Sequence, residues 1–258
     1  METIKKGSLS LDVLSLQCSL PGLKIDGDFG DKTVEAVKKF QSDMGLDSDG
    51  IVGPGTWNLL FKTHIKRPSI TEADYKSISE SLGVSSAILK AIHEVETCQS
   101  SYLSSGHPAL LFEAHVFYRE LKKVGKNPDI LLKDHPGIIS KSWNRSLYKG
   151  GIREVTRINE AFRISPKAAL MSASFGAFQI CGFNYSLSGY QNVFEFYRDL
   201  WISEVSQLRM LANFLKGSGI VPYMKSLNFR EIAKRYNGSG YEKNNYHIKL
   251  EKAYNKFK

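Results

Sequence analysis

The sequence predicts a mainly α-helical protein made of a small three-helix unit and a larger helical domain that contains a short β-hairpin. Three observations support this fold class: apolar residues recur at helical spacing, a turn motif repeats near the start of the chain, and the net charge changes sign between the two parts. The periodicity breaks around a proline at residues 65–71, which predicts a linker. We therefore expect domains over residues 1–64 and 72–258.

The charge is distributed unevenly between these two parts. The chain has 258 residues, a hydrophobic fraction of 42% and a formal charge of +9. Residues 1–64 hold seven lysines against nine acidic residues, a formal charge of −2, so the remaining residues carry +11. This asymmetry favours two domains, the second of which meets an anionic partner such as nucleic acid, a membrane surface or an acidic polymer. A generally basic solvated surface is the alternative explanation.

Cysteine usage indicates a reducing compartment, and the start of the chain bears on secretion. Cys18, Cys98 and Cys181 are odd in number and far apart, so we expect no disulfide framework. The stretch from Met1 to Ser10 has no apolar core of the kind found in secretion signals. No apolar run reaches the roughly 20 residues that span a bilayer. We expect neither a Sec signal nor stable membrane insertion.

The first part of the chain contains an internal repeat. Asp26–Thr33 and Asp49–Thr56 both read DGxxGxxT, with an offset of 23 residues. Asp-Gly favours a turn, and we expect Thr33 and Thr56 to lie at the start of the helix that follows each turn, with Thr33 as its cap. An earlier helix completes a three-helix unit. The apolar residues that mark these helices are Leu11, Leu14, Leu16, Val34, Val37 and Phe40.

A glutamate on the apolar face of a helix is the first catalytic candidate. We expect a helix from Ser85 or Ser86 that places Glu96 on its apolar face and Glu94 on the opposite side. Burial and the helix C-terminus both disfavour an ionised Glu96. A carboxylic acid that stays protonated near neutral pH suits general-acid cleavage of a glycosidic bond. A structural glutamate paired with Arg or Lys is the alternative.

A second carboxylate follows this helix. Tyr102–Phe112 is interpreted as a hairpin with its turn at Ser105-Gly106, ending at Glu113, which opens another helix. Such a hairpin would return Glu113 toward a sugar bond held by the first glutamate. Glu113 is equally well explained as an acidic residue that favours the first turn of its helix.

Two later segments contain small and polar residues. Ser165-Pro166 predicts the start of a helix that carries the chain to residues 173–180, where small residues allow close approach of a helix or ligand. Asn228 and Glu231 form a capping box for a helix that ends at Tyr236–Gly238.

Motifs for metal-dependent and nucleophilic chemistry are missing from the sequence. His93–Thr97 resembles HExxH only in its first two residues, since Thr97 stands where the second zinc ligand would be. The chain has neither a GxSxG nucleophile elbow nor a glycine-rich phosphate loop. We expect no metal and no organic cofactor.

Residues 8–62 resemble the peptidoglycan-binding type 1 domain. The pattern of that family, DGxFGxxTxxAVxxFQxxxGLxxDGxVGxxTW, is matched at nearly every marked position from Asp26 to Trp57. The resemblance implies a cell-wall-binding module.

The remainder, from about residue 72 to 257, is similar to goose-type lysozymes and lytic transglycosylases, and more closely to the N-acetylmuramidase domain of modular bacteriophage endolysins. The shared motifs are Glu96-Thr97, Leu111–Phe117, Ser172–Asn184 and Arg235–Gly238. The resemblance implies a lysozyme-like fold, Glu96 as the general acid and Glu113 as a second carboxylate. It also implies a saccharide groove lined by Ser174, Gln179, Tyr236 and Asn237. The chain departs from the family at Phe175, where Trp is expected, and at Thr97, where Ser is expected.

These resemblances lead to a functional expectation. The chain should be a monomeric endolysin that hydrolyses the β-1,4 bond between N-acetylmuramic acid and N-acetylglucosamine in peptidoglycan and so lyses the host. We expect it to remain in the host cytoplasm until a holin opens a route to the wall. Its charge suggests an anionic outer-envelope lipid as a second partner, whereas no motif supports binding of nucleic acid. The alternatives are a lytic transglycosylase that forms 1,6-anhydromuropeptides and a non-catalytic protein that binds the cell wall or lipopolysaccharide.

Overall fold

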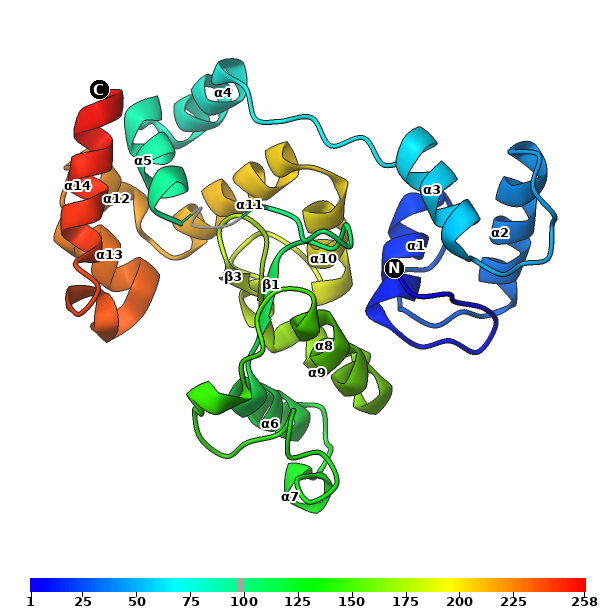
Figure 1. The fold of residues 1–258 in the computed structure, drawn as a ribbon. Helices are drawn as coiled ribbons and strands as arrows, with labels where there is room; N and C mark the ends of the chain where they lie inside the picture. Colours follow the sequence, from blue (N-terminus) through cyan, green and yellow to red (C-terminus); the bar gives the residue numbers. More distant parts are fainter. Residues whose placement is uncertain (97–99) are drawn as a thin grey trace.

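The computed structural model describes residues 1–96 and 100–258 and shows helices arranged around one small sheet (Figure 1). The mainly α fold is confirmed. The helices are α1 (Leu11–Ser19), α2 (Asp31–Asp43), α3 (Pro54–Thr63), α4 (Glu72–Leu82), α5 (Ser86–Glu96), α6 (Ala114–Lys123), α7 (Pro128–Leu131), α8 (Arg153–Ile164), α9 (Pro166–Met171), α10 (Val193–Ile202), α11 (Glu204–Gly217), α12 (Val221–Lys225), α13 (Phe229–Asn237) and α14 (Tyr246–Phe257). Short 3-10 turns are η1 (Arg145–Leu147), η2 (Gly182–Asn184) and η3 (Gly238–Glu242).

The repeated motif of the N-terminal unit builds the same turn twice. Gln17 Nε2 donates to Asp26 Oδ1 at 2.9 Å, and Gln41 Nε2 donates to Asp49 Oδ1 at 2.9 Å. The oxygen of each glutamine amide accepts the backbone N–H of the glycine that follows the aspartate. Each Asp-Gly turn is therefore fixed by a buried glutamine from the preceding helix, because buried backbone donors need partners.

The expected cap at Thr33 is wrong. Helices α2 and α3 begin at Asp31 and Pro54, with glycines in extended conformation at their N-caps. Thr33 and Thr56 consequently lie inside the first turn of each helix, where both are buried. Glycine occupies each N-cap without a side-chain hydrogen bond, and the buried Thr56 hydroxyl accepts one from Gln41 Nε2 at 3.4 Å.

The sheet consists of β1 (Leu110–Phe112), β2 (Ala173–Phe175) and β3 (Ile180–Cys181), antiparallel and in that order. Leu111 pairs with Ser174, and Ser174 pairs with Cys181. Successive strand residues point to opposite faces, so this row is half-exposed while the residues beside it are buried. One face of the sheet is thus open at Leu111 and Ser174.

The expected hairpin over Tyr102–Phe112 is confirmed at its turn, where the Gly106 N–H donates to the Leu103 carbonyl, but its second arm pairs elsewhere. Residues 102–108 make a turn with one isolated bridge, between Tyr102 and Pro108, and β1 then pairs with β2. The helix expected to start at Ser165-Pro166 is α9, and the segment it leads to, residues 173–180, forms most of the β2–β3 hairpin. Gly176 has φ +72° and Gln179 has φ +46°, values that a right-handed helix excludes.

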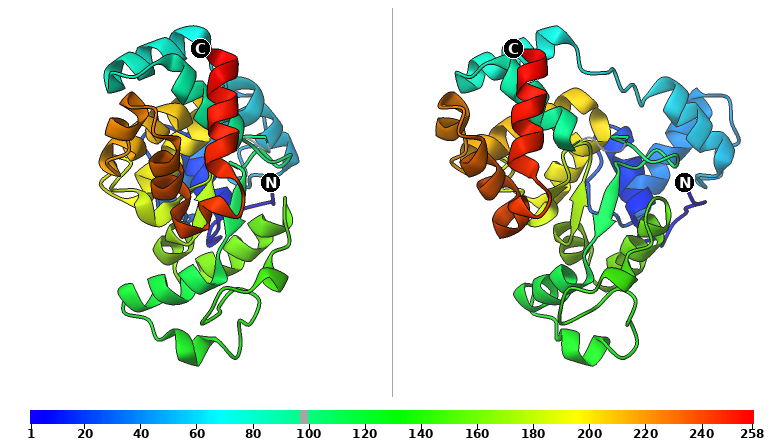
Figure 2. Two further views of the ribbon diagram at one scale, coloured as in Figure 1. Left: turned by 90° about the vertical axis from the view of Figure 1, so that its left-hand side faces the viewer. Right: turned by 60° about the vertical axis from the view of Figure 1, so that its left-hand side comes forward.

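The larger domain places its last helix against the helix that carries Glu96. Helices α5 and α14 pack side by side in all views (Figure 2). Their contact brings residues about 150 positions apart in sequence together, including Glu96 and Tyr246. Within residues 1–96 and 100–258, no helix is both long and apolar enough to cross a membrane.

Helix α1 joins the two parts of the molecule because it is buried on both sides. Val13 and Leu16 belong to the core of the N-terminal unit, whereas Leu11 and Leu14 belong to the core of the larger domain. In Figure 1, α1 lies between α2 of the N-terminal unit and α10 of the larger domain. Leu11 and Leu14 therefore stabilise the larger domain. The domain boundaries at residues 64 and 72 stay predictions.

Hydrogen bonds also cross this interface. The Leu11 N–H donates to Asn159 Oδ1 at 2.9 Å, and the hydroxyls of Ser15 and Tyr197 are 2.9 Å apart. Trp201 Nε1 donates to Ser19 Oγ at 2.9 Å. All three bonds join α1 to α8 or α10. The predicted linker contributes Arg67, whose guanidinium lies 3.7 Å from the ring centroid of Tyr102.

Candidate active site

Glu96 lies where the sequence places it, at the end of α5. The apolar face of this helix is buried, and Glu94 is exposed and forms an ion pair with Lys256 at 2.6 Å. The two glutamates therefore face different environments. Thr97, where the family resemblance leads us to expect Ser, and the third cysteine, Cys98, lie outside the described residues.

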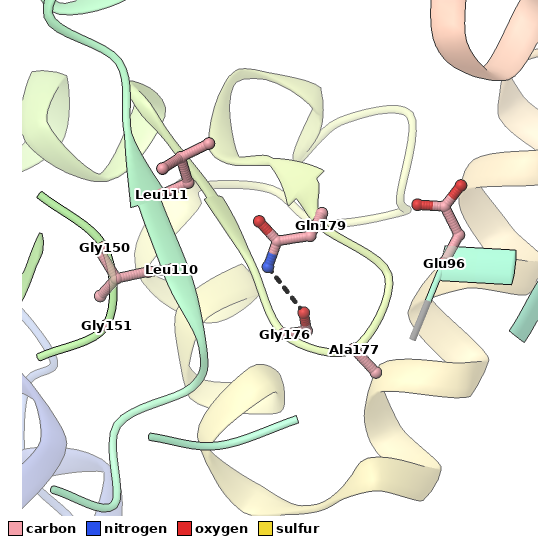
Figure 3. Close-up of a pocket in the computed structure, with 8 residues that line it drawn as sticks. All are labelled: Glu96, Leu110, Leu111, Gly150, Gly151, Gly176, Ala177 and Gln179. Carbon is pink, nitrogen blue, oxygen red and sulfur yellow. Dashed lines mark hydrogen bonds between the residues drawn. The ribbon is translucent and has the colours of Figure 1, made fainter. Parts of the chain in front are cut away.

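The Glu96 carboxyl faces a small pocket of about 160 Å³. In Figure 3, Glu96 stands on one side of the pocket and the Gly150–Gly151 loop on the other, with Gln179 between them. Burial raises the pKa of Glu96 to about 7, and a hydrogen bond from the Tyr246 hydroxyl to Oε1 acts in the opposite direction. Near neutral pH, Glu96 is therefore protonated in a large fraction of molecules, as a general acid must be.

Tyr246 is a residue of the site that the sequence did not identify. It is 7% exposed, and its ring stacks on that of Tyr236, with centroids 6.2 Å apart. The spacing of Tyr246, Leu250 and Ala253 along the last helix could have predicted burial of this tyrosine. Its bond to Glu96 could not be predicted, because the helices are distant in sequence.

Tyr236 and Asn237 are not among the residues that line the pocket. The Tyr236 hydroxyl donates to the Phe178 carbonyl at 3.0 Å, which ties α13 to the β2–β3 turn. Burial raises the pKa of Tyr246, and a hydrogen bond from the Asn237 side chain lowers it. In this structure the two predicted groove residues support Tyr246 and the turn beside Glu96.

Gln179 lines the pocket with Glu96, and Ser174 holds it there. Ser174 Oγ donates to Gln179 Oε1 at 3.0 Å, and Gln179 Nε2 donates to the Gly176 carbonyl at 2.9 Å. The backbone of Gln179 is left-handed, a conformation that costs about 1–2 kcal/mol for a residue with a side chain. The turn accepts this strain, and Gln179 presents its amide to the pocket.

Glu113 does not share the Glu96 pocket. It is the N-cap residue of α6, and its backbone N–H donates to the Ser172 carbonyl at 2.8 Å. Its carboxylate accepts a hydrogen bond from the Tyr148 hydroxyl and lies 3.4 Å from His115 Nδ1. It lines a neighbouring pocket of about 460 Å³, and Leu111 lines both pockets. The two predicted carboxylates thus face successive hollows along β1.

Glu154 is a second residue that the sequence did not identify. This buried carboxylate accepts hydrogen bonds from the backbone N–H groups of Lys149 at 2.6 Å and Gly150 at 2.9 Å, and from Phe112 at 3.2 Å. Arg157 Nη1 donates to Glu154 Oε2 at 2.6 Å and also to the Phe112 carbonyl. The Glu154–Arg157 pair therefore ties the loop that forms one wall of the pocket to β1.

The structure holds no obvious cluster of metal ligands in the part of the chain that it describes, residues 97–99 excluded. His93, the first residue of the partial HExxH motif, interacts with the Tyr75 hydroxyl, and burial lowers the pKa of its imidazole. Cys18 and Cys181 are free thiols.

Comparison with known proteins identifies both parts of the chain. Residues 85–258 match the N-acetylmuramidase family, and residues 14–60 match a peptidoglycan binding domain. The crystal structure of an endolysin from a Burkholderia phage, AP3, is similar over 99% of both chains, with a TM-score of 0.69 and 34% identity.

Two curated relatives match over shorter segments. A zinc D-Ala-D-Ala carboxypeptidase of Streptomyces albus G is 42% identical over 23% of this chain and 26% of that protein. An uncharacterised protein of Kitasatospora aureofaciens is 53% identical over 17% of this chain and 43% of that protein. The chain spans less than half the length of each of these two relatives. The family match, the arrangement of the two parts and the similarity to a phage endolysin along the whole chain lead to one assignment: the chain belongs to the N-acetylmuramidase family and has the organisation of a modular endolysin.

Proposed function

We propose that the protein hydrolyses the β-1,4 bond between N-acetylmuramic acid and N-acetylglucosamine in peptidoglycan, with Glu96 as the general acid. The observation that carries the proposal is the protonatable Glu96 carboxyl, whose pKa is about 7, at the side of a pocket. The acid donates its proton to the glycosidic oxygen as positive charge develops on the sugar ring. The N-terminal domain would hold the same polymer, which raises the local concentration of the bond.

The roles of the polar groups follow from their positions. Gln179 reaches into the pocket and is positioned to bind an N-acetyl or hydroxyl group, with Ser174 fixing its amide. Tyr236 and Asn237 act through Tyr246, which contacts the acid. Glu113 is the candidate to direct water, from the neighbouring hollow of the same strand.

Replacing Glu96 with Gln tests the central assignment. Glu96→Gln keeps the shape and removes the transferable proton, so wall lysis should fall by a factor of about 10²–10⁴. Glu94→Gln is the matched control, since this exposed residue lies on the same turn and pairs with Lys256. Lysis is measured as turbidity loss of chloroform-treated Gram-negative cells, and circular dichroism confirms the fold. Wall clearance by Glu96→Gln at the wild-type rate would refute the assignment.

A lytic transglycosylase is the second candidate, and one observation favours it. Glu96 is the only carboxylate among the described residues that line its pocket. In a transglycosylase the muramic acid's own hydroxyl takes the place of water, so no second carboxylate is needed to activate water. Mass spectrometry of the released muropeptides distinguishes the reactions, because 1,6-anhydro products are lighter by one water. A spectrum dominated by hydrated ends would eliminate this candidate.

We also propose that a holin releases the protein from the host cytoplasm. The similarity to a phage endolysin along the whole chain supports this proposal. Fractionation of intact producing cells should find the protein inside the inner membrane until that membrane is permeabilised. Detection in the periplasm of cells with an intact membrane would contradict this route.

A further inference from the structure

The hollow beside the Glu96 pocket has the features of a binding site in its own right. It has a volume of about 460 Å³ and is lined by Leu111, Glu113, Trp143, Arg145 and Tyr148. Leu111, at one edge of the pocket in Figure 3, lines both hollows. A polymer lying along β1 would therefore place one unit near Glu96 and an adjacent unit in this second hollow.

Trp143 is exposed at the edge of this hollow. Its side chain is 59% exposed, although tryptophan is among the residues that gain most from burial. The indole centroid lies 6.3 Å from that of Tyr148, so the two rings form an aromatic corner. An exposed aromatic at the rim of a pocket is a feature of interaction sites.

The segment around Trp143 is fixed before any ligand arrives. Ser140 Oγ donates to the Ser142 carbonyl at 2.6 Å on one side of the tryptophan. On the other side, Asn144 caps η1 by accepting the Ser146 N–H at 3.0 Å. Lys141 is anchored to Asp129 by an ion pair of 2.7 Å. Little further ordering is needed on binding, which lowers the entropic cost.

The charged groups of the hollow differ in how they are engaged. Glu113 is already held by the Tyr148 hydroxyl and lies near His115. Arg145 is exposed, and none of the carboxylates in residues 1–96 and 100–258 forms an ion pair with it. A planar guanidinium that is free of local partners suits a carboxylate of the ligand, which it can bind through two parallel bonds.

We propose that this hollow is a subsite for a peptide-bearing N-acetylmuramic acid unit of the glycan, next to the unit at Glu96. The apolar face of the sugar ring, with its axial C–H bonds, stacks on Trp143, because the π face carries negative charge. Arg145 binds a carboxylate of the peptide stem. The inference rests on the proposed action on peptidoglycan and adds that the enzyme recognises the stem as well as the sugars.

Soluble glycan tetramers with intact stems test this subsite, together with the same tetramers stripped of stems by an amidase and then amidated at the lactyl carboxylates that the amidase exposes. Trp143→Ala should raise KM about tenfold on both substrates with kcat little changed, since it removes binding rather than chemistry. Arg145→Ala should raise KM about tenfold on the stem-bearing tetramers and leave KM unchanged on the stripped ones. Arg145→Lys should recover only part of this loss, because lysine lacks the planar fork.

Matched controls are available outside the hollow. Ile130→Ala removes an exposed apolar side chain outside the hollow, and Arg153→Ala removes an exposed cation outside it. Both should behave as the wild type. Calorimetric titration of the stem-bearing tetramer into full-length Glu96→Gln, with and without Trp143→Ala or Arg145→Ala, reads binding without turnover.

The outcomes separate the subsite from the proposed function. Failure of the wild type to cleave or bind either tetramer would refute both. Cleavage by the wild type that depends on Glu96, together with unchanged KM and affinity in Trp143→Ala and Arg145→Ala, would overturn the subsite alone. An equal loss on both substrates in Arg145→Ala would overturn the assignment of the stem.

Discussion

The residue that tunes the acid is Tyr246. Its hydroxyl donates a hydrogen bond to Glu96 and stabilises the ionised carboxylate, whereas burial stabilises the neutral acid. Burial has the larger effect, so the pKa of Glu96 is about 7. The acid must be protonated to act, so kcat/KM should fall about tenfold per pH unit above neutrality. Without Tyr246, burial would act unopposed by this bond.

Tyr246→Phe should therefore move the alkaline limb of the kcat/KM profile to higher pH, by up to about one pH unit. Tyr254→Phe, on the same helix and packed against Phe229, should leave the profile in place. The pH dependence of tetramer cleavage checks both variants. A limb that stays in place or moves to lower pH in Tyr246→Phe would show that this hydroxyl does not stabilise the ionised acid.

The site was predictable only in part at the residue scale. The helical spacing of the apolar residues around Glu96 places this glutamate on the buried face from sequence alone, because the pattern lies within one helix. The support from Tyr246 depends on a contact between helices distant in sequence. Nothing in the local pattern around Glu154 shows that it bonds three backbone N–H groups.

At the scale of elements, the loop over residues 148–151 depends on a buried ion pair. Glu154→Gln should leave Arg157 buried without a countercharge and weaken the bonds to the loop, at a cost of about 3–5 kcal/mol. The melting temperature should fall by on the order of 10 °C, and KM should rise because the pocket wall loosens.

Glu160→Gln is the control for this change, since Glu160 lies on the same helix, is 44% exposed and lies 3.2 Å from His135 Nδ1. Thermal unfolding by circular dichroism measures both variants. Equal melting temperatures for Glu154→Gln and Glu160→Gln would mean that the ion pair does not hold the loop.

Elements whose signals are local were predicted well, and those that depend on pairing were not. The helices from Ser86 and from Pro166 begin where caps and spacing indicate. The three short strands could not be found from periodicity, because β1 pairs with residues about 60 positions later. The turn between β2 and β3 was not predicted either, because its positive φ angles at Gly176 and Gln179 leave no periodic pattern in the sequence.

At the scale of the whole molecule, α1 couples the stability of the two parts. Leu14 is fully buried in the core of the larger domain, so Leu14→Ala should cost about 2–5 kcal/mol. The loss should appear in both parts as one transition, because they share this helix. The exposed Ile51 provides the control variant Ile51→Ala.

Urea unfolding monitored by tryptophan fluorescence, in single-tryptophan variants that retain Trp57 or Trp201, reports the two parts separately. Coincident midpoints that shift together in Leu14→Ala are expected. Two separated transitions, with only one affected, would show that the parts unfold independently.

The charge of +11 beyond residue 64 also acts at this scale. We propose that it draws the enzyme to stem carboxylates and anionic envelope lipid, so lysis should weaken as salt rises toward 0.3 M, where the screening length falls below about 8 Å. The rate of turbidity loss in a salt series measures this. A flat response would reduce the charge to a contribution to solubility.

The shared helix also constrains how such proteins can be recombined. A crossover in the linker after residue 64 would carry α1 away with the binding domain, and the larger domain would lose Leu11 and Leu14 from its core and the partners of Asn159 and Tyr197. A crossover immediately after α1 would leave that face covered. Chimeras that keep the muramidase folded should therefore retain residues 11–19. The segment that can be exchanged is thus shorter than the binding domain itself.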